Sequence, residues 1–513
     1  MFSFFLQCRV PKESLSKSLA HSILYEMAAK FAFVYDERML EHECLYDGTM
    51  EECPERTKKV YERLKKEGLL EDAVQITAGI ATKAEINLGH PEELIEELEN
   101  LKTVEQCEEY CRSKDFLWLH PESLKAARLA LGGTIDCVRA NLEGLVGNCF
   151  AIVRPPGHHS YGIHAQGYCV FNNVAIAAKY AVEKLGLERV MIVDFDLHVG
   201  NGTYEIVKDD DRILFVSSHL YNHGSYWPYY KEFDCDPFGN NIFIPFNCAM
   251  NSESDLLAAY NNVVMPIAKE FQPELILISA GFDSGYYDVM LELGQGIKAP
   301  GYGYIARMLN DLCPEKVIAV FEGGYFWKNY TESAVMLTRG LRGMSLPKIY
   351  HPERVNGSMS EVIWDNLCHQ AKKWNSAKEQ LEKLQKQQIA LGLSPYVPRS
   401  PKLFLAFGFR EHLDFVRDSG CLKTREWFPK LTKEQEEFAA RKIDDYIKAY
   451  EHSNDLVMPD PDNLLKQLIW DEQTAADCYI RNAKVCVQSY EGFTNYLKSN
   501  DGVFECFDKK LMK

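Results

Sequence analysis

The chain has 513 residues, of which 46% are hydrophobic and 26% are charged, a composition typical of a folded globular protein. Its formal net charge is −17, from 57 lysine and arginine residues against 74 aspartate and glutamate residues. Because nucleic-acid binding needs a basic surface, this balance argues against a direct nucleic-acid partner and is compatible with a basic partner or substrate.

The 16 cysteines are scattered without a CxxC pair, which indicates free thiols in a reducing compartment. The start, MFSFFLQCRV, has only a short apolar run before Arg9, too little for a secretory signal peptide. No apolar stretch of the sequence approaches the roughly 18 residues that a membrane span needs. We therefore expect a protein of the cytoplasm, the nucleus or both, without a membrane partner.

In chain order, the first predicted element is a short helix over residues 12–30. The apolar runs that follow predict strands over residues 31–36, 147–155, 189–196, 212–218, 273–283 and 316–325, and helices between them over 172–186 and 255–271. Since most of these runs are apolar without alternation, the sheet should be covered on both faces. Alternating strands and helices predict a parallel, doubly wound α/β domain.

The alternation fades near residue 345, although a helix over 361–374 should still pack on the main domain. The turn-rich stretch 394–401 predicts an extended linker. We therefore expect an N-terminal extension, a main domain and a mostly helical C-terminal extension, over residues 1–30, 31–376 and 377–513.

In the C-terminal extension, Thr432 and Gln435 have the spacing of a capping box. An amphipathic run through Phe438, Ile443 and Ile447 follows. These helices suit either protein partners or simple packing, and the sequence leaves both roles open.

Polar residues follow two of the predicted strands at the end where a doubly wound sheet collects functional groups. Asp194, Asp196 and His198 occupy alternate positions, so an extended chain points them the same way. Asp283 ends another strand and is otherwise a candidate helix cap or turn residue. Two carboxylates and one imidazole can complete a three-ligand site with an open position, as catalytic zinc requires.

The stretch RPPGHHS places His158 and His159 side by side after a third strand. Each imidazole alone suits a structural role, but beside a metal the pair offers a general base and a partner of different protonation. Tyr325, after a Gly-Gly turn, is either a buried structural tyrosine or a hydrogen-bond donor to a developing oxyanion. Together these groups suit metal-assisted hydrolysis of an acyl bond.

Five motifs, RPPGHHS, GYCVFNNVAIAA, IVDFDLHVGNG, ISAGFDSG and FEGGY, resemble the zinc-dependent histone deacetylase family in order and approximate spacing. GYCVFNN and the Tyr226-Trp227-Pro228 stretch look most like class II members, particularly class IIb. The resemblance covers residues 31–376 and implies the arginase/deacetylase-like α/β fold.

The resemblance implies a zinc ion bound by Asp196, His198 and Asp283. It also implies a structural potassium ion, held by Ser217 and by the backbone carbonyls of Asp194, Asp196 and His198.

The catalytic roles that the resemblance implies concern five residues. His159 would be the general base for the attacking water, and His158 would attend the leaving amine. Asp194 and Asn201 would orient these imidazoles, with Asn201 where the family often has Asp. Tyr325 would polarise the substrate carbonyl.

The substrate channel that the resemblance implies runs between Tyr168, preceded by Gly167, and Tyr226, where Phe is usual. At its rim, Leu293 aligns with the position where an acetylpolyamine-specific branch has Glu. The loop over residues 284–292 is longer than usual, so the alignment can shift by one residue. The adjacent Glu292 is therefore an alternative candidate for the gate residue.

Two further departures from the family pattern concern residues near the candidate site. Val199 stands where a second His usually follows the ligand histidine, and the front of the domain keeps Pro54 and Arg56 without the His-Pro pair before them. The leading expectation is a hydrolase that removes acetyl groups from lysine side chains of histones or of proteins such as tubulin. The alternatives are an acetylpolyamine deacetylase and a non-catalytic scaffold.

Overall fold

The structure is a computed structural model that describes residues 29–48, 50–224, 226–248, 251–288, 295–350, 355–398, 432–452 and 456–457. Most of the helix expected over residues 12–30 lies outside the described residues. Its last two residues belong to the first strand, so that part of the expectation is wrong.

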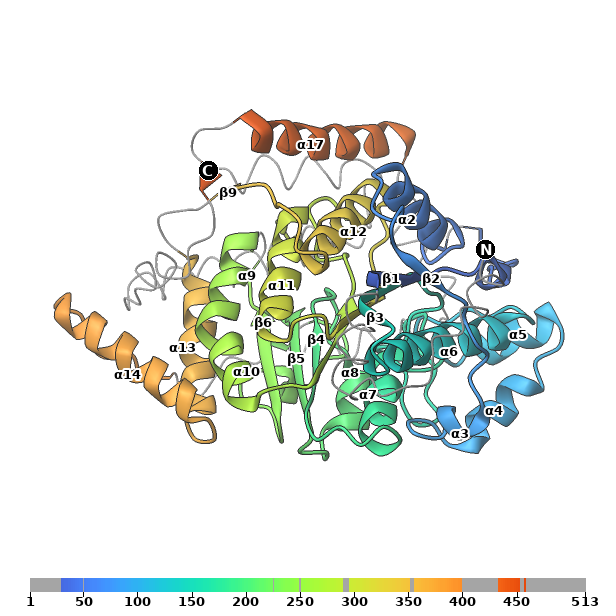
Figure 1. The fold of residues 1–513 in the computed structure, drawn as a ribbon, viewed down its shortest axis with the longest axis horizontal. Helices are drawn as coiled ribbons and strands as arrows, with labels where there is room; N and C mark the ends of the chain where they lie inside the picture. The colour runs from blue at the N-terminus through green and yellow to red at the C-terminus, as the bar shows by residue number, and fades with distance from the viewer. Residues whose placement is uncertain are drawn as a thin grey trace, which may run out of the picture.

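Eight parallel strands form the main sheet of the described chain, in the order β2-β1-β3-β8-β7-β4-β5-β6 (Figure 1). Their bounds are β1 Ala29–Val34, β2 Val74–Ile76, β3 Val146–Ala151, β4 Val190–Asp194, β5 Ile213–Leu220, β6 Asn241–Phe246, β7 Leu275–Ala280 and β8 Val317–Phe321. Every strand expected from the apolar runs is confirmed, and so is the doubly wound parallel sheet.

The sequence did not predict the two outer strands, β2 and β6. β2 has only three residues, which is too short to form an apolar run. β6 contains Pro245, which lacks a backbone N–H and argues against an interior strand; β6 pairs only with β5 at the edge of the sheet, where proline is tolerated.

Helices cover both faces of the sheet (Figure 1). One face carries α2 Glu55–Lys66, α9 Glu253–Ala259, α10 Met265–Phe271, α11 Ala299–Leu312, α12 Trp327–Leu341, α13 Gly357–Gln370 and α14 Asn375–Ala390. The other carries α3 Lys83–Ile86, α4 Glu92–Glu99, α5 Val104–Cys111, α6 Ser123–Leu142, α7 Asn173–Glu183 and α8 Asn201–Val207. The short elements are η2 Glu37–Glu41, η3 Asn222–Gly224, η4 Lys231–Phe233, the π-helical turn η5 Tyr260–Val264, and the antiparallel pair β9 Ile349–Tyr350 and β10 Leu456–Val457.

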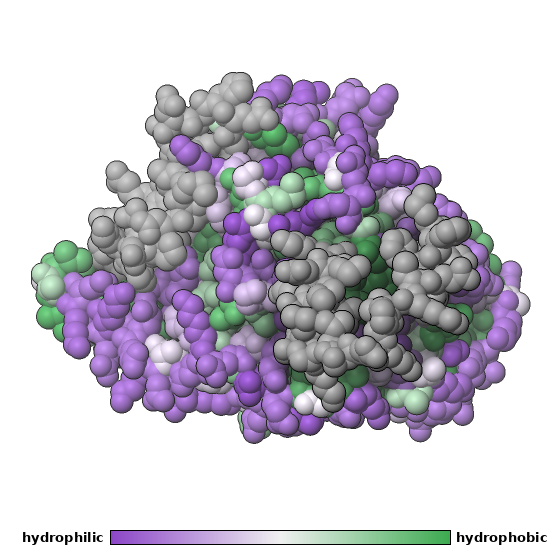
Figure 2. Space-filling view, viewed as in Figure 1, coloured by the Kyte–Doolittle hydropathy of each residue, from purple (hydrophilic) through white to green (hydrophobic). Residues whose placement is uncertain are grey.

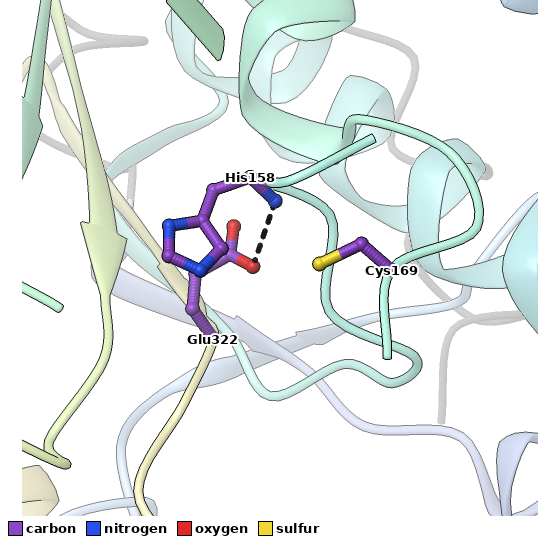
Figure 3. Close-up of side chains that lie close together, drawn as sticks. All are labelled: His158, Cys169 and Glu322. Atoms are coloured by element: carbon purple, nitrogen blue, oxygen red, sulfur yellow. Dashed lines mark hydrogen bonds between the residues drawn. The ribbon is translucent and has the colours of Figure 1, made fainter. Parts of the chain in front are cut away.

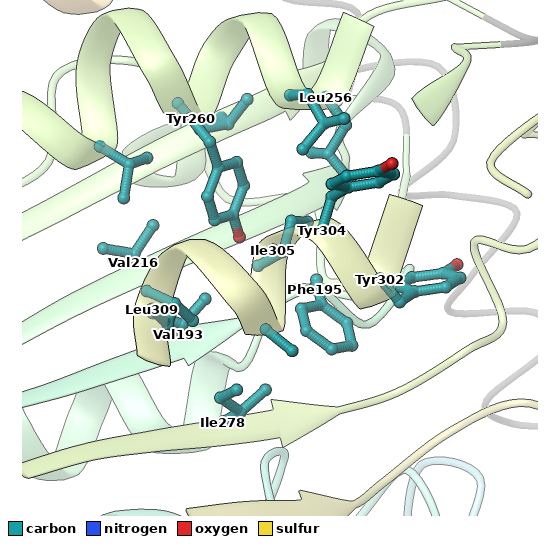
Figure 4. Packing of buried hydrophobic residues seen from close by; sticks show 14 of the residues in the cluster. Val193, Phe195, Val216, Leu256, Tyr260, Ile278, Tyr302, Tyr304, Ile305 and Leu309 are labelled. Carbon is teal, nitrogen blue, oxygen red and sulfur yellow. The ribbon is translucent and has the colours of Figure 1, made fainter. Parts of the chain in front are cut away.

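Side chains of the central strands alternate between two apolar cores. Met191 and Val193 of β4 face one core, while Val190 and Ile192 face the other, and all four are fully buried. Figure 4 shows Tyr260 and Ile305 packing from the helical layer onto the sheet. Burial on both faces explains why these strands are continuously apolar.

The described C-terminal part is mostly helical: it contains α14 and α17, together with the two-residue strand β10. The predicted capping box is confirmed, because Thr432 N donates to Gln435 Oε1 at 2.8 Å and Gln435 N donates to Thr432 Oγ1 at 3.3 Å. It opens α17 Lys433–His452, which lies beside α12 (Figure 1). Among the described helices, none combines the length and the apolar character that a membrane crossing requires.

Candidate active site

Four neighbouring strands, β3, β8, β7 and β4, end at one edge of the sheet. Because all four are parallel, the loops that leave their carboxyl ends converge there. These loops carry RPPGHHS after β3, DFDLH from the last residue of β4 onward, GFD after β7 and EGGY after β8. The edge therefore brings together the polar motifs found in the sequence.

Asp196, His198 and Asp283 form the centre of this site. One ligand atom from each lies within 4.8 Å of the others. Nδ1 of His198 lies 3.1 Å from Oδ2 of Asp283 and 3.3 Å from Oδ1 of Asp196. Both carboxylates are buried, with exposed fractions of 0% and 1%.

The charges of these three residues fit a divalent cation. Burial, followed by the charge of Asp196, raises the pKa of Asp283 to about 7. Burial alone would lower the pKa of His198, but the two carboxylates raise it to about 10. Two ionised carboxylates carry two negative charges, and a single imidazole can balance at most one of them, so the group favours a bound cation. The oxygen donors of the carboxylates and the nitrogen donor of the imidazole suit zinc or iron.

Two glycines leave room for the carboxylates. A Cβ atom at Gly281 would lie 1.9 Å from Oδ2 of Asp196, and one at Gly323 would lie 2.4 Å from the same oxygen. The backbone N–H of Gly323 also donates to this oxygen at 2.9 Å. Close approach to Asp196 therefore explains one glycine in each of the motifs ISAGFDSG and FEGGY.

The two adjacent histidines have different partners. Nδ1 of His158 lies 3.0 Å from Oδ2 of Asp194, and Nδ1 of His159 lies 2.7 Å from Oδ1 of Asn201. Burial alone would lower the pKa of His158, but Asp196 and Asp194 raise it to about 10. Burial, followed by the charge of His158, lowers the pKa of His159. Their ring centroids are 3.9 Å apart, so two imidazoles of opposite protonation tendency lie in contact.

Tyr325 lies at the end of the Gly-Gly turn after β8. Its backbone N–H donates to Oδ2 of Asp288 at 2.9 Å, and its ring lies 5.9 Å from that of Tyr168. The buried guanidinium of Arg56 lies 4.9 Å from the centre of the Tyr325 ring and donates to the carbonyl of Gly324 at 2.7 Å. The turn that carries the tyrosine is therefore held from both sides.

Residues 50–341 match the Histone deacetylase domain. The chain belongs to the histone deacetylase family. Every metal, histidine and tyrosine position discussed above falls inside the matched range, which covers more than half of the chain.

Individual relatives point to class II of the histone deacetylase family. The chain is 39% identical over 329 residues to "Polyamine deacetylase HDAC10" of Mus musculus, covering 62% of this chain and 49% of the relative. It is 32% identical over 348 residues to "Histone deacetylase 6" of Caenorhabditis elegans, covering 64% of this chain and 36% of the relative. The matches thus span about half the length of the first relative and less of the second. The class II assignment expected from the motifs is confirmed.

A solved structure supports the deacetylase fold. The structure titled "Crystal Structure of HDA15 HD domain" aligns with a TM-score of 0.63 at 31% identity. The alignment covers 69% of this chain and 98% of that one. The arginase/deacetylase-like fold expected from the resemblance is therefore confirmed.

The expected channel residues lie around the site. The Tyr226 hydroxyl is 3.0 Å from Nε2 of His198, and the Tyr168 hydroxyl donates to Oε2 of Glu51 at 3.4 Å. Gly167 has φ +56°, and a Cβ there would come within 2.4 Å of the His159 ring. Both tyrosine hydroxyls thus have polar partners, while the channel itself stays a prediction.

Two other groups of expected residues remain predictions. Leu293 and Glu292 at the rim lie outside the described residues. Ser217 pairs with Asp194 across β5 and β4, and its hydroxyl lies 3.0 Å from Nδ1 of His219. The potassium ion expected there stays a prediction.

Glu322 is a site residue that sequence reasoning missed. Its Oε2 accepts from the backbone N–H of Gly157 at 2.7 Å. The same oxygen accepts from the backbone N–H of His158 at 3.3 Å, a bond that Figure 3 shows. With Cys169 and His158 it forms a buried group of metal-ligand type, and burial raises the pKa of Glu322 to about 7. Its hydrogen bonds fix the backbone of the histidine pair. The available signal was an acidic residue directly after an apolar strand.

Proposed function

We propose that this protein is a zinc-dependent deacetylase, and that acetyl-lysine side chains of histones or other proteins, such as tubulin, are its first candidate substrates. One observation carries the proposal: the three ligand residues, the two differently partnered histidines and Tyr325 meet at one edge of the sheet. A scaffold without catalysis would not require this set of groups to be complete.

Asp196, His198 and Asp283 would hold the zinc ion. Zinc bound there would supply Lewis acidity toward the substrate carbonyl and the attacking water. Backbone amides support the carboxylates, because Leu197 N donates to Oδ1 of Asp283 at 2.6 Å and His198 N donates to Oδ1 of Asp196 at 2.9 Å. These bonds fix the orientation of the two carboxylate groups.

His159 is proposed as the general base. Because the carbonyl oxygen of Asn201 can only accept, the proton of neutral His159 resides on Nδ1 and leaves a lone pair on Nε2. A neutral amide gives an imidazolium less support than a carboxylate does. His159 is therefore suited to take a proton from the attacking water.

His158 is proposed as the proton donor to the leaving amine. The Asp194 carboxylate accepts from Nδ1 of His158 and is fully buried, so it stabilises the charged form of the ring. A protonated His158 can release the proton of Nε2 as the carbon–nitrogen bond breaks, so the amine leaves in neutral form. The two partners, one amide and one carboxylate, thereby separate the two proton transfers.

Tyr325 is proposed to donate a hydrogen bond to the substrate carbonyl oxygen as negative charge develops on it. One such preorganised donor is typically worth roughly 10²–10³-fold in turnover. Arg56 supports this role, because it lies against the ring and holds the preceding carbonyl. The donor is then oriented before the substrate binds.

The second candidate substrate is an N-acetylated polyamine. The names of the mammalian relatives favour it, since the mouse protein is a polyamine deacetylase. Leu293 in the sequence favours acetyl-lysine, because the polyamine branch is expected to have Glu there. Both substrates present an acetylated amine on a linear aliphatic stem, so one catalytic centre serves either.

A paired substrate comparison tests the proposal. Zinc-loaded protein should hydrolyse acetyl-lysine peptides faster than N-acetylspermidine, and Asp283→Asn should abolish both reactions. A preference for N-acetylspermidine would transfer the proposal to the polyamine candidate. Activity that survives in Asp283→Asn would contradict the metal mechanism, and an inactive wild-type protein would favour the scaffold.

A further inference from the structure

The C-terminal helix α17 has an apolar face that is buried against the main domain. Ala439 and Ile443 have exposed fractions of 0%, and Tyr446 has 9%. These residues recur at intervals of three and four, which places them on one side of a helix. The opposite side, with Glu437 and Asp445, is exposed, and the top of the molecule in Figure 2 is hydrophilic there.

The surface that α17 covers belongs to the rim of the candidate active site. Its apolar face forms a cluster with Phe326, which directly follows Tyr325, and with Tyr286 and Tyr287. The rings of Tyr286 and Tyr446 are 5.9 Å apart, and those of Tyr287 and Phe438 are 6.1 Å apart. Tyr286 and Tyr287 belong to the segment 283–288, which begins at the metal-ligand candidate Asp283 and ends at Asp288. We call this segment the rim loop.

Polar contacts attach α17 at two further points. Nζ of Lys328, in the first turn of α12, lies 2.7 Å from Oδ1 of Asp444. The Tyr446 side chain is hydrogen-bonded by the backbone of Ala299, where α11 begins. The helix is therefore attached to both α11 and α12 as well as to the rim loop.

The rim loop connects α17 to the catalytic tyrosine. Asp288 is fully buried, and its Oδ2 accepts from the backbone N–H groups of Tyr325 at 2.9 Å and Phe326 at 3.0 Å. Its neighbour Tyr287 has φ +62°, a left-handed conformation that a non-glycine residue keeps only when its surroundings hold it. α17 supplies part of those surroundings through Phe438.

We propose that α17 is a positioning element of the active site: by packing on the rim loop and Phe326, it holds Asp288 and through it the backbone of Tyr325. This inference rests on the proposed function and extends it to a helix outside the matched family domain. Loss of the packing should loosen the turn that carries Tyr325 and lower turnover, without altering the groups that bind metal.

A matched pair of substitutions in α17 tests the proposal. Ala439→Glu places a charge in the buried face, and Ala449→Glu makes the same change at an exposed position of the same helix. In the full-length protein, Ala439→Glu should lower kcat by roughly 10-fold, a fraction of what one oriented donor contributes, with Ala449→Glu close to wild type. Amide hydrogen exchange at residues 286–288 and 325–326 should accelerate in Ala439→Glu alone. Equal kcat and equal exchange in the two variants would overturn the proposal.

A double-mutant cycle separates positioning from general destabilisation. If α17 acts through Tyr325, Ala439→Glu should cost little further kcat in a Tyr325→Phe background. An undiminished loss in that background would overturn the route through the tyrosine. Because exchange is measured without substrate, accelerated exchange supports the proposal even if the wild-type protein proves inactive, and unchanged exchange overturns it.

A surface variant guards against misfolding of Ala439→Glu. Asp444→Lys reverses one partner of the Lys328 ion pair at a half-exposed position, and should reduce kcat by roughly 2-fold. The swapped pair Asp444→Lys with Lys328→Asp should recover the lost activity. If kcat does not fall in Asp444→Lys, or if the swapped pair does not restore it, the ion pair between Lys328 and Asp444 does not support turnover.

Discussion

The hydroxyl of Tyr226 lies 3.0 Å from Nε2 of His198, on the side of the ring opposite the nitrogen that faces Asp196 and Asp283. When Nδ1 of His198 binds a metal, Nε2 carries a proton that the tyrosine oxygen can accept. Partners of this kind fix the orientation of a ligand imidazole, and their loss typically costs 10–100-fold in metal affinity.

Tyr226→Phe should therefore weaken zinc binding by roughly 10-fold, measured by competition with a chelator of known affinity. Tyr168→Phe is the matched control, because it removes a hydroxyl that contacts Glu51 rather than His198. Equal zinc affinities in the two variants would show that the Tyr226 hydroxyl does not support the ligand.

Tyr325→Phe removes the proposed donor to the carbonyl while keeping the ring that Arg56 contacts. We expect kcat to fall by roughly 10²-fold or more, with KM for the acetylated substrate changed little, because the bond strengthens only as charge develops. A rate close to wild type would return Tyr325 to a structural role.

The partner of His159 provides a test based on pH. Asn201→Asp would place a carboxylate against Nδ1, which stabilises the imidazolium and raises the pKa of His159. A base with a raised pKa stays protonated to higher pH, so the acid limb of the kcat/KM profile should move upward by roughly 1 to 2 pH units. An unmoved acid limb would assign that limb to another group.

The parts of the site that follow apolar strands could be predicted from the sequence, and the parts that depend on distant backbone groups could not. Asp196 and Asp283 stand two and three residues beyond the buried strands β4 and β7, and parallel strands bring such positions to one edge. Glu322 also directly follows an apolar strand, so its position at this edge carried a signal. Its partners, like those of Asp288, are backbone N–H groups, which leave no pattern in the side chains.

The same distinction holds for the helices. The capping box and amphipathic pattern predicted α17, because both signals are local. The surface that α17 covers could not be predicted, because the sequence between residues 398 and 432 has no pattern that indicates where on the main domain the helix packs. Helix 255–271 was expected to be continuous, whereas a π-helical turn at Tyr260–Val264 divides it.

His90 provides a test of stability that is independent of the metal. The ring is buried, its Nδ1 lies 2.8 Å from the carbonyl oxygen of Gly162, and its Nε2 accepts from the backbone N–H of Asn172 at 3.0 Å. These partners fit the neutral ring, and burial lowers the pKa of His90 from 6.5 to about 4. Protonation would remove the acceptor that Asn172 uses.

Because the pKa of His90 is lower in the folded state, the unfolded chain binds more protons between about pH 4 and 6.5, and stability falls as pH falls through that window. At pH 5 the contribution of His90 to this loss is about 2 kcal/mol relative to pH 7.

In His90→Gln, the difference in unfolding free energy between pH 7 and pH 5 should be smaller by that amount, measured by denaturant unfolding. His164→Gln, at an exposed histidine, should follow wild type. If His90→Gln instead keeps the full wild-type pH dependence, the buried His90 ring does not contribute to acid destabilisation.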